Sequence, residues 1–272
     1  MSFGRLLCPF LTAALVAAGC SQAPTAPSAV VLDPPTLTAP GAPALADTST
    51  NSPFTAINPP RAVGVTRLVA FGDSITWGAM SAFDSSYVYA AASGGYAERL
   101  EVNLNLLHQP QRFSVFNDGQ PGELAISALP RFRSMLTSRR PGGVLLLEGI
   151  NDLSNGFSPS STANALRQML DAAAAMGVPV AIATMYQTYG ATYPDGTFRD
   201  NGAALVPAFN SAVRALATGR VNVALVDLEP LMRDRRLVGA DGIHTTDAGF
   251  DVMESAFRRV IEAAYPVRGS FQ

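Results

Sequence analysis

From Ala62 onward, five short apolar segments alternate with longer amphipathic segments. The apolar segments are Arg67 to Phe71, Phe113 to Asn117, Gly143 to Gly149, Pro179 to Met185 and Val221 to Leu228. Apolar character that is nearly continuous over so few residues is typical of strands covered on both faces, as in parallel sheets. The alternation therefore predicts an α/β fold of three layers, α/β/α, with right-handed crossovers between parallel strands.

The segments between and after these strands have the spacing of amphipathic helices. They are Gly95 to Leu107, Glu123 to Thr137, Thr162 to Met176, Ala203 to Ala217 and Thr246 to Ala264. All of these elements fit one domain of ordinary size, which we place at residues 62–272.

The first 19 residues have the composition of a signal peptide, because Arg5 precedes an apolar stretch that ends in small residues. Cys20 follows in the sequence LVAAGC, which resembles the lipobox of bacterial lipoproteins, where the cysteine is lipidated. Ordinary cleavage near the same alanines is the alternative. Cys8 lies in the segment that would be removed, so we expect no internal disulfide in the mature chain.

Residues 20–61 are rich in Pro, Ala, Thr and Ser and show no hydrophobic period, which predicts a semi-extended tether. Ser21 after the cysteine is compatible with sorting to the outer membrane. We therefore expect an exported lipoprotein that is held at the outer membrane only through Cys20 and faces the periplasm or the cell surface. Secretion of the cleaved chain is the alternative.

The charge balance and the motifs exclude several classes of function. A formal net charge of −2 with 15% charged residues favours neither nucleic acid nor an anionic membrane surface as a partner. The chain has no G-x-G-x-x-G and no P-loop, and no G-x-S-x-G elbow of the α/β-hydrolase kind. We expect no cofactor, and a small-molecule or glycan substrate remains.

Polar motifs follow four of the predicted strands, and they fall on one edge of the predicted sheet. They are GDSITWG from Gly72, NDGQPGE from Asn117, GIND from Gly149 and DGIHTTDAG from Asp241. In open parallel sheets the ligand crevice lies beyond the carboxyl ends of the strands. The four motifs therefore mark a candidate site.

Ser74 in the first motif is either a turn residue or a nucleophile, and a serine nucleophile needs a base. Of the two histidines, His244 lies on the expected edge, whereas His108 is expected at the opposite edge as a solvated helix cap. Asp241, three residues before His244, is placed to orient the imidazole. The alternative is a helix-capping loop in which Asp241 and His244 bind only backbone.

An oxyanion needs fixed hydrogen-bond donors, which a glycine turn and the side chain of Asn151 can supply. Alone, each of these features indicates an ordinary turn. Asp241, His244 and Asp247 also present the alternative of a metal site, but one histidine with two acids fits any turn, and we expect no metal.

At these motifs the chain resembles the SGNH hydrolases, also called the GDSL esterase/lipase family, over about Arg67 to Tyr265. The resemblance implies a flavodoxin-like five-stranded sheet of order 2-1-3-4-5 and metal-free hydrolysis of acyl esters. It implies that Ser74 is the nucleophile, that His244 is the base and that Asp241 orients His244.

The same resemblance implies an oxyanion hole made by the backbone N–H groups of Ser74 and Gly122 and by the side chain of Asn151. Gly119 competes for the glycine role, and we prefer Gly122 for its five-residue offset from Asn117.

Two long segments, Ala79 to Gly94 and Tyr186 to Gly202, carry aromatic side chains near the predicted crevice, as does Trp77. They suit sugar rings or acyl chains equally or simply cover the sheet; within the second, we expect YPDGTF to form a turn in the pocket wall. We expect a serine esterase acting on short-chain acyl or acetyl esters. An acyltransferase to carbohydrate hydroxyls and a non-catalytic glycan-binding surface lipoprotein are the alternatives.

Overall fold

The computed structural model describes residues 62–81, 88–193 and 195–266. The predicted signal peptide, Cys20 and the predicted tether lie outside the described residues. The described chain contains one five-stranded parallel sheet. Its strands are β1 (Arg67–Gly72), β4 (Ser114–Gly119), β5 (Gly143–Leu147), β6 (Val180–Ala183) and β9 (Val223–Val226).

The strand order is β4-β1-β5-β6-β9, so the five strands lie in the order 2-1-3-4-5. Both the α/β class and this order are confirmed. At the carboxyl end of the sheet, Gly72 lies opposite Gly119 on one side and Leu147 on the other. The segments that follow β1, β4 and β5 therefore begin at the same level.

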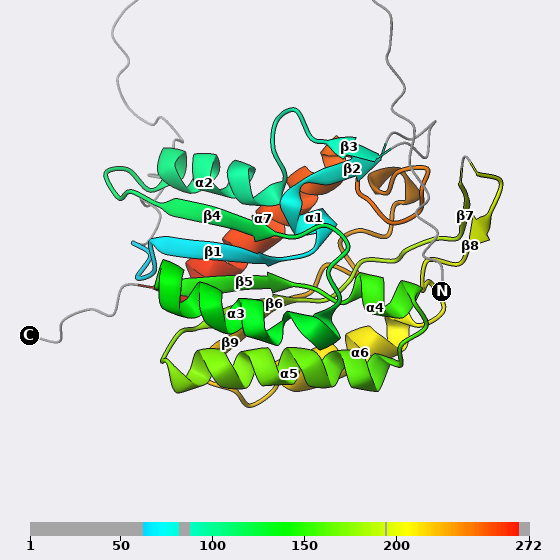
Figure 1. The fold of residues 1–272 in the computed structure, drawn as a ribbon. Helices are drawn as coiled ribbons and strands as arrows, with labels where there is room; N and C mark the ends of the chain where they lie inside the picture. Colours follow the sequence, from blue (N-terminus) through cyan, green and yellow to red (C-terminus); the bar gives the residue numbers. More distant parts are fainter. Residues whose placement is uncertain (1–61, 82–87, 194, 267–272) are drawn as a thin grey trace, which may run out of the picture. The chain divides into compact units, whose positions relative to one another are not determined.

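Five long helices cover the sheet: α2 (Tyr96–Leu107), α3 (Ala125–Arg139), α5 (Pro159–Ala175), α6 (Val206–Ala217) and α7 (Asp247–Ala264). Helices α2 and α7 pack against each other on one face, and α5 contacts both α3 and α6 on the other. Figure 1 shows the three layers, which confirm the predicted architecture. None of the helices in the described ranges is long and apolar enough to cross a membrane.

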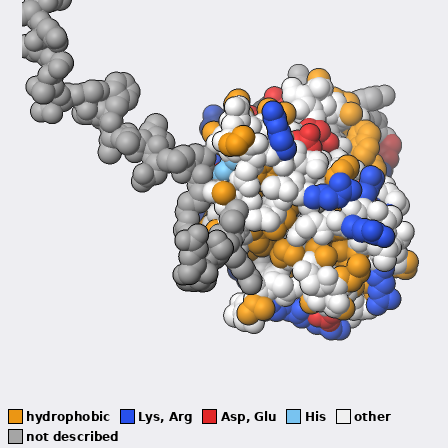
Figure 2. Space-filling view, turned by 90° about the vertical axis from the view of Figure 1, so that its left-hand side faces the viewer, with side chains coloured by type: hydrophobic (Ala, Val, Ile, Leu, Met, Phe, Trp, Pro, Cys, Tyr) orange, Lys and Arg blue, Asp and Glu red, His pale blue; other side chains and the backbone are white. Residues whose placement is uncertain are grey.

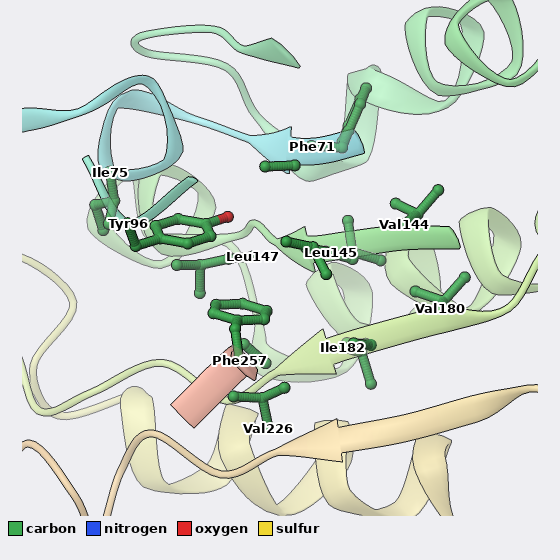
Figure 3. Close-up of a cluster of buried hydrophobic side chains, with 14 of the residues drawn as sticks. Phe71, Ile75, Tyr96, Val144, Leu145, Leu147, Val180, Ile182, Val226 and Phe257 are labelled. Carbon is green, nitrogen blue, oxygen red and sulfur yellow. The ribbon is translucent and has the colours of Figure 1, made fainter. Parts of the chain in front are cut away.

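The core lies between these layers, and it explains why the predicted strands form. Leu68 to Phe71 of β1 and Val144 to Leu147 of β5 are almost completely buried, as the parallel-sheet pattern requires. Figure 3 shows the rings of Tyr96 from α2 and Phe257 from α7 lying over each other, with centroids 4.7 Å apart. This stack joins the two helices on one face of the sheet.

Several short elements were not expected from the sequence. Helices α1 (Ser74–Trp77) and α4 (Ile150–Ser154) directly follow β1 and β5, and η1 (Arg235–Leu237) precedes the last motif. Two hairpins interrupt the long segments: β2 (Ala79–Ser81) with β3 (Val88–Ala90), and β7 (Ala191–Thr192) with β8 (Phe198–Arg199). Elements this short span too few residues to show a hydrophobic period.

The edge of the sheet at the amino ends of the strands faces the viewer in Figure 2, where hydrophobic side chains lie among basic ones. His108 caps the end of α2 at this edge, as expected, but the prediction that it is solvated is wrong. Its side chain is buried, with Nε2 2.9 Å from Oε1 of Glu262 in α7. Phe113 packs beside the ring and helps to exclude water.

Candidate active site

Ser74, His244 and Asp241 form a continuous hydrogen-bonded chain at the carboxyl edge of the sheet. Ser74 Oγ lies 2.8 Å from His244 Nε2, and His244 Nδ1 lies 2.5 Å from Asp241 Oδ2. Asp241 is fully buried, whereas Ser74 is 8% exposed. Residues that are 170 positions apart in the chain therefore meet in the order serine, imidazole, carboxylate.

The Asp241 carboxylate binds backbone and imidazole at the same time. Its Oδ1 accepts hydrogen bonds from the N–H groups of Ile243 (3.2 Å) and His244 (3.0 Å), while Oδ2 faces the ring. The alternative in which Asp241 and His244 bind only backbone is therefore wrong. Gly242 has φ +80°, and a Cβ there would lie 2.0 Å from the carbonyl oxygen of Tyr189, so this turn requires glycine.

Three side chains from residues 186–201, before α6, bind the backbone of the loop that carries Asp241 and His244. The Tyr186 hydroxyl donates to the carbonyl oxygen of Ile243 (2.7 Å), and Asn201 Nδ2 donates to that of Asp241 (2.8 Å). The Tyr193 hydroxyl contacts the same Asp241 oxygen at 3.4 Å. Sequence reasoning placed Tyr193 in the pocket wall but missed the bonds of all three residues, because nothing in a tyrosine or asparagine in a long loop identifies its partner.

Ser74 is the first residue of α1, and Asp73 is the N-cap of that helix. One oxygen of Asp73 accepts from the N–H of Ile75 at 2.9 Å. The first N–H groups of a helix have no partner within the helix, and they stabilise negative charge. Gly72 before them leaves no space for a side chain, since a Cβ would lie 2.0 Å from the carbonyl oxygen of Leu147.

The two candidate glycines have different surroundings. Gly122 is the third residue of a turn closed by the bond from Glu123 N to Gln120 O (3.2 Å). With Pro121 before it and φ +78°, this turn has the sequence and the sign of φ of type II. Gly119 instead packs on α1, where a Cβ would lie 2.1 Å from the backbone nitrogen of Trp77.

Asn151 lies in α4, and its side chain reaches the turn of Gly122. Asn151 Nδ2 donates to the carbonyl oxygen of Glu123 at 2.9 Å. The next residue, Asp152, is buried and accepts from the N–H groups of Ala125 (2.7 Å) and Ile126 (3.1 Å). The first turn of α3 is thus capped from α4, which fixes the second and third motifs to each other.

Arg131 of α3 secures the same region from the other side. Its guanidinium donates to Oε1 of Glu123 (2.8 Å) and to the carbonyl oxygens of Asp118 (2.7 Å) and Gly72 (3.2 Å). It also lies over the Phe71 ring, 3.8 Å from its centroid. One cation therefore joins the ends of β1 and β4 to the turn of Gly122; its position within a helix gave no indication of this in the sequence.

Three acidic side chains in or next to the first and third motifs are buried: Asp73, Glu148 and Asp152. Burial raises the pKa of Asp73 to about 6, although the hydrogen bond from Ile75 and the charge of His244 oppose this effect. Burial also raises the pKa of Asp152, and it raises that of Glu148 well above the usual range. The sequence contains a signal for them, because Asp73 and Asp152 lie within site motifs and Glu148 adjoins one, but position alone does not predict burial.

A cleft of about 690 Å³ lies between α4 and the segment before α6; Ile243, the neighbour of His244, lines it, but Ser74, Asp241 and His244 do not. Its lining includes Asn151, Asn155, Tyr193, Arg199, Asp200 and Ile243. The turn at the end of the β7–β8 hairpin closes through the bond from Tyr193 N to Thr197 O (2.9 Å), and Tyr193 lies in the wall as predicted. Of the other predicted segment, residues 82–87 lie outside the described residues.

Asp247, the third member of the metal alternative, pairs with Arg99 of α2 and its side chain is 62% exposed. It therefore does not join Asp241 and His244. Within the described ranges, no group of three or more His, Cys, Asp or Glu side chains is arranged to hold a metal ion.

Comparison with known proteins gives matches for the same part of the chain. A model of the GDSL-like lipase/acylhydrolase family matches residues 70–252. An aryl esterase of M. smegmatis is similar in structure, with a TM-score of 0.62 and 18% identity, over 73% of this chain and 99% of that one. A search of curated proteins finds no match.

Two further structures are similar at the same level. A lipase/acylhydrolase from Enterococcus faecalis has a TM-score of 0.57 and 19% identity, over 75% of this chain and 100% of that one. Axe2, an acetylxylan esterase from Geobacillus stearothermophilus, has a TM-score of 0.58 and 19% identity, over 74% and 96%. At these identities the structures support the fold.

Proposed function

The chain belongs to the GDSL-like lipase/acylhydrolase family, and we propose that it is a serine esterase in which Ser74, His244 and Asp241 form the catalytic triad. The observation that carries this proposal is the hydrogen-bonded chain from Ser74 Oγ through the imidazole to the buried carboxylate of Asp241. A hydroxyl becomes a competent nucleophile when an oriented imidazole accepts its proton.

In this mechanism, Ser74 Oγ attacks the ester carbonyl carbon while His244 Nε2 takes the hydroxyl proton. Asp241 stabilises the imidazolium that forms, and His244 then gives its proton to the departing alkoxide. Water, activated by the same imidazole, hydrolyses the acyl-enzyme and restores Ser74.

The oxyanion hole in this proposal comprises the N–H groups of Ser74 and Gly122 and the side chain of Asn151. Three features support it: the place of Ser74 at the start of α1, the open surroundings of Gly122, and the bond that directs Asn151 to the turn of Gly122. Fixed donors of this kind stabilise the charge of the tetrahedral intermediate.

For the substrate we propose short-chain acyl or acetyl esters of a polar alcohol. The cleft that Asn151 and Ile243 line carries polar side chains, including Asn155, Arg199 and Asp200. A long acyl chain requires an extended apolar wall, because burial of methylene groups supplies its binding energy. Axe2, which has the same fold, is an acetylxylan esterase, and this agrees with the proposed substrate class.

The test is hydrolysis of p-nitrophenyl acetate, butyrate and octanoate by the full chain and by Ser74→Ala. We expect the rate to fall at least about 10⁴-fold in the variant, since loss of a triad member typically has this effect. We expect kcat/KM to decrease from acetate to octanoate. Equal rates in the two proteins would contradict the proposal, and product formed only when a sugar acceptor is added would favour acyl transfer.

A further inference from the structure

Glu148, at the end of β5, is a buried carboxyl group that the proposed mechanism does not use. It is 2% exposed, and no donor among the described residues reaches its Oε2. From the part of the chain that the structure describes, its Oε1 accepts only a long bond of 3.3 Å from the N–H of Gly149. An ionised carboxylate so poorly solvated is very unfavourable, so the environment favours the neutral acid.

Asp73, the residue before the nucleophile, is also a buried carboxyl group with one oxygen that lacks a donor in the described chain. It is fully buried, and its Oδ2 also lacks a donor among the described residues. Strands β1 and β5 are parallel neighbours in which Gly72 lies opposite Leu147. Asp73 and Glu148 are the next residues of the two strands, so they leave the sheet side by side, where adjacent strands are about 4.8 Å apart.

Arg131 lies near this pair, but its guanidinium donates to the carbonyl oxygen of Gly72 and to Glu123, and no hydrogen bond joins it to Asp73 or Glu148 among the described residues. The charges of Glu123 before α3 and Asp152 in α4 act on both carboxyl groups, and that of His244 acts on Asp73. Two buried tyrosines are also affected: burial and then the charges of Asp73 and Glu148 raise the pKa of Tyr96 in α2, and burial and then the charge of Asp73 raise that of Tyr186.

Burial and then the charge of Asp73 raise the pKa of Glu148 well above its usual range, whereas that of Asp73 is raised to about 6. Asp73 Oδ1 accepts a short hydrogen bond of 2.9 Å from Ile75, whereas Glu148 accepts only the long one of 3.3 Å from Gly149 among the described residues, so we assign the proton of the pair to Glu148.

We propose that Glu148 is a positioning residue, whose carboxyl proton is donated in a hydrogen bond to Oδ2 of Asp73 and fixes the carboxylate that caps the turn of Ser74. No proton is transferred in this arrangement: the O–H bond of Glu148 stays intact. Two buried oxygens without partners then become donor and acceptor, which removes the cost of leaving both unsatisfied.

The consequence for the nucleophile follows from the contacts of Asp73. Its Oδ1 accepts from the N–H of Ile75 (2.9 Å), and its backbone carbonyl accepts from the N–H of Trp77 (3.0 Å). Ser74 belongs to the short segment, residues 73–77, that these two bonds hold in a helical turn. A carboxylate that is also held through Oδ2 cannot rotate away, so Ser74 Oγ stays directed at His244. The effect on catalysis rests on the proposed function. The hydrogen bond between Glu148 and Asp73 does not depend on that function.

The first test compares Glu148→Gln, which keeps an N–H donor, with Glu148→Leu, which removes it. In the full chain we expect kcat for p-nitrophenyl acetate to fall roughly ten- to hundredfold in Glu148→Leu, with KM nearly unchanged, and to stay within about threefold in Glu148→Gln. The matched control is Glu254→Gln, a buried carboxylate that pairs with Arg258 on α7. Wild-type kcat in Glu148→Leu would overturn the proposal.

The second test detects the proton itself and needs no activity. Infrared spectra of the wild-type protein at pH 7 should show the C=O stretching band of a carboxylic acid, with the shift in D₂O that an exchangeable proton causes. This component should disappear in Glu148→Gln and persist in Glu254→Gln. Its persistence in Glu148→Gln would overturn the proposal even if Glu148→Leu does not fold. Loss of the band together with full activity in Ser74→Ala would instead refute only the proposed function.

Discussion

Asp241 illustrates how much a single residue contributes to this site. One oxygen fixes the loop by accepting the N–H groups of Ile243 and His244, and the other faces His244 Nδ1. Spacing in the sequence places Asp241 within reach of the ring, but it does not predict this division, because the division depends on the turn at Gly242. The three triad residues could therefore be predicted from the sequence, but the hydrogen bonds that support them could not.

Asn at position 241 should separate these two roles. In Asp241→Asn the side-chain oxygen can still accept both backbone N–H groups, so the loop should fold. The amide nitrogen would then face His244 Nδ1 and favour the tautomer whose Nε2 already carries a proton, which cannot accept that of Ser74. We expect kcat to fall roughly 10³- to 10⁴-fold with an unchanged melting temperature. A kcat within tenfold of the wild type would show that Asp241 does not orient the base.

Asp73 gives a prediction for stability as a function of pH. Because burial raises its pKa from 3.8 to about 6 in the folded protein, the folded state holds the proton more tightly than the unfolded state. The contribution of Asp73 to stability should therefore fall as pH rises from about 4 to about 6, by about 3 kcal/mol at 1.36 kcal/mol per pKa unit.

Asp73→Asn should lack this decline, because its side-chain oxygen can still accept from the N–H of Ile75 and its amide does not titrate. The measurement is the free energy of unfolding in urea for both proteins at pH 4, 5, 6 and 7. Parallel curves for the two proteins would rule out Asp73 as the titrating group.

Among the elements, the long strands and helices followed from the sequence, and the short connections that carry chemistry did not. The core pattern of β1 and β5 is strong because each strand is covered on both faces. Helices α1 and α4 have only four and five residues, and they form because Asp73 caps the first and Gly149, with φ +117°, precedes the second. Their position after a strand was predictable, and their helical form depends on tertiary contacts.

Gly119, the last residue of β4, and Gly122, in the turn that follows, provide a test at this scale. Gly122→Ala places a Cβ in open space but in a left-handed conformation, so we expect a loss of stability of about 1 to 2 kcal/mol and a folded protein. Gly119→Ala directs its Cβ into the backbone of α1, and we expect a much larger loss. Thermal unfolding of the two variants decides the point; equal melting temperatures would mean that α1 does not pack on Gly119 as described.

At the scale of the whole molecule, the question is where in the cell the esterase domain acts, and the evidence for this comes from the sequence before residue 62. We propose that the chain is exported and lipidated at Cys20, and that residues 20–61 tether the domain to the outer membrane, on the basis of LVAAGC and the Pro-rich segment after it. The domain would then act on esters in the periplasm or at the cell surface.

Lipidation predicts a clear difference for Cys20→Ser. In a bacterial host grown with an alkyne fatty acid, the wild-type chain should be labelled and sediment with membranes. Cys20→Ser should carry no label and remain in the soluble fraction, with Ser74→Ala as the control that is labelled normally. An unlabelled wild-type chain that is cleaved and released would favour the secreted alternative.

The most direct test of the central claim is covalent trapping of the nucleophile. The full chain would be treated with diethyl p-nitrophenyl phosphate, which phosphorylates an activated serine, and the modified residue would be located by mass spectrometry of its peptides. We predict a diethylphosphoryl group on Ser74, loss of esterase activity in parallel with modification, and no modification of Ser74→Ala. Modification of a different residue with loss of activity, or an active esterase that the reagent leaves unmodified, would contradict the assignment of Ser74.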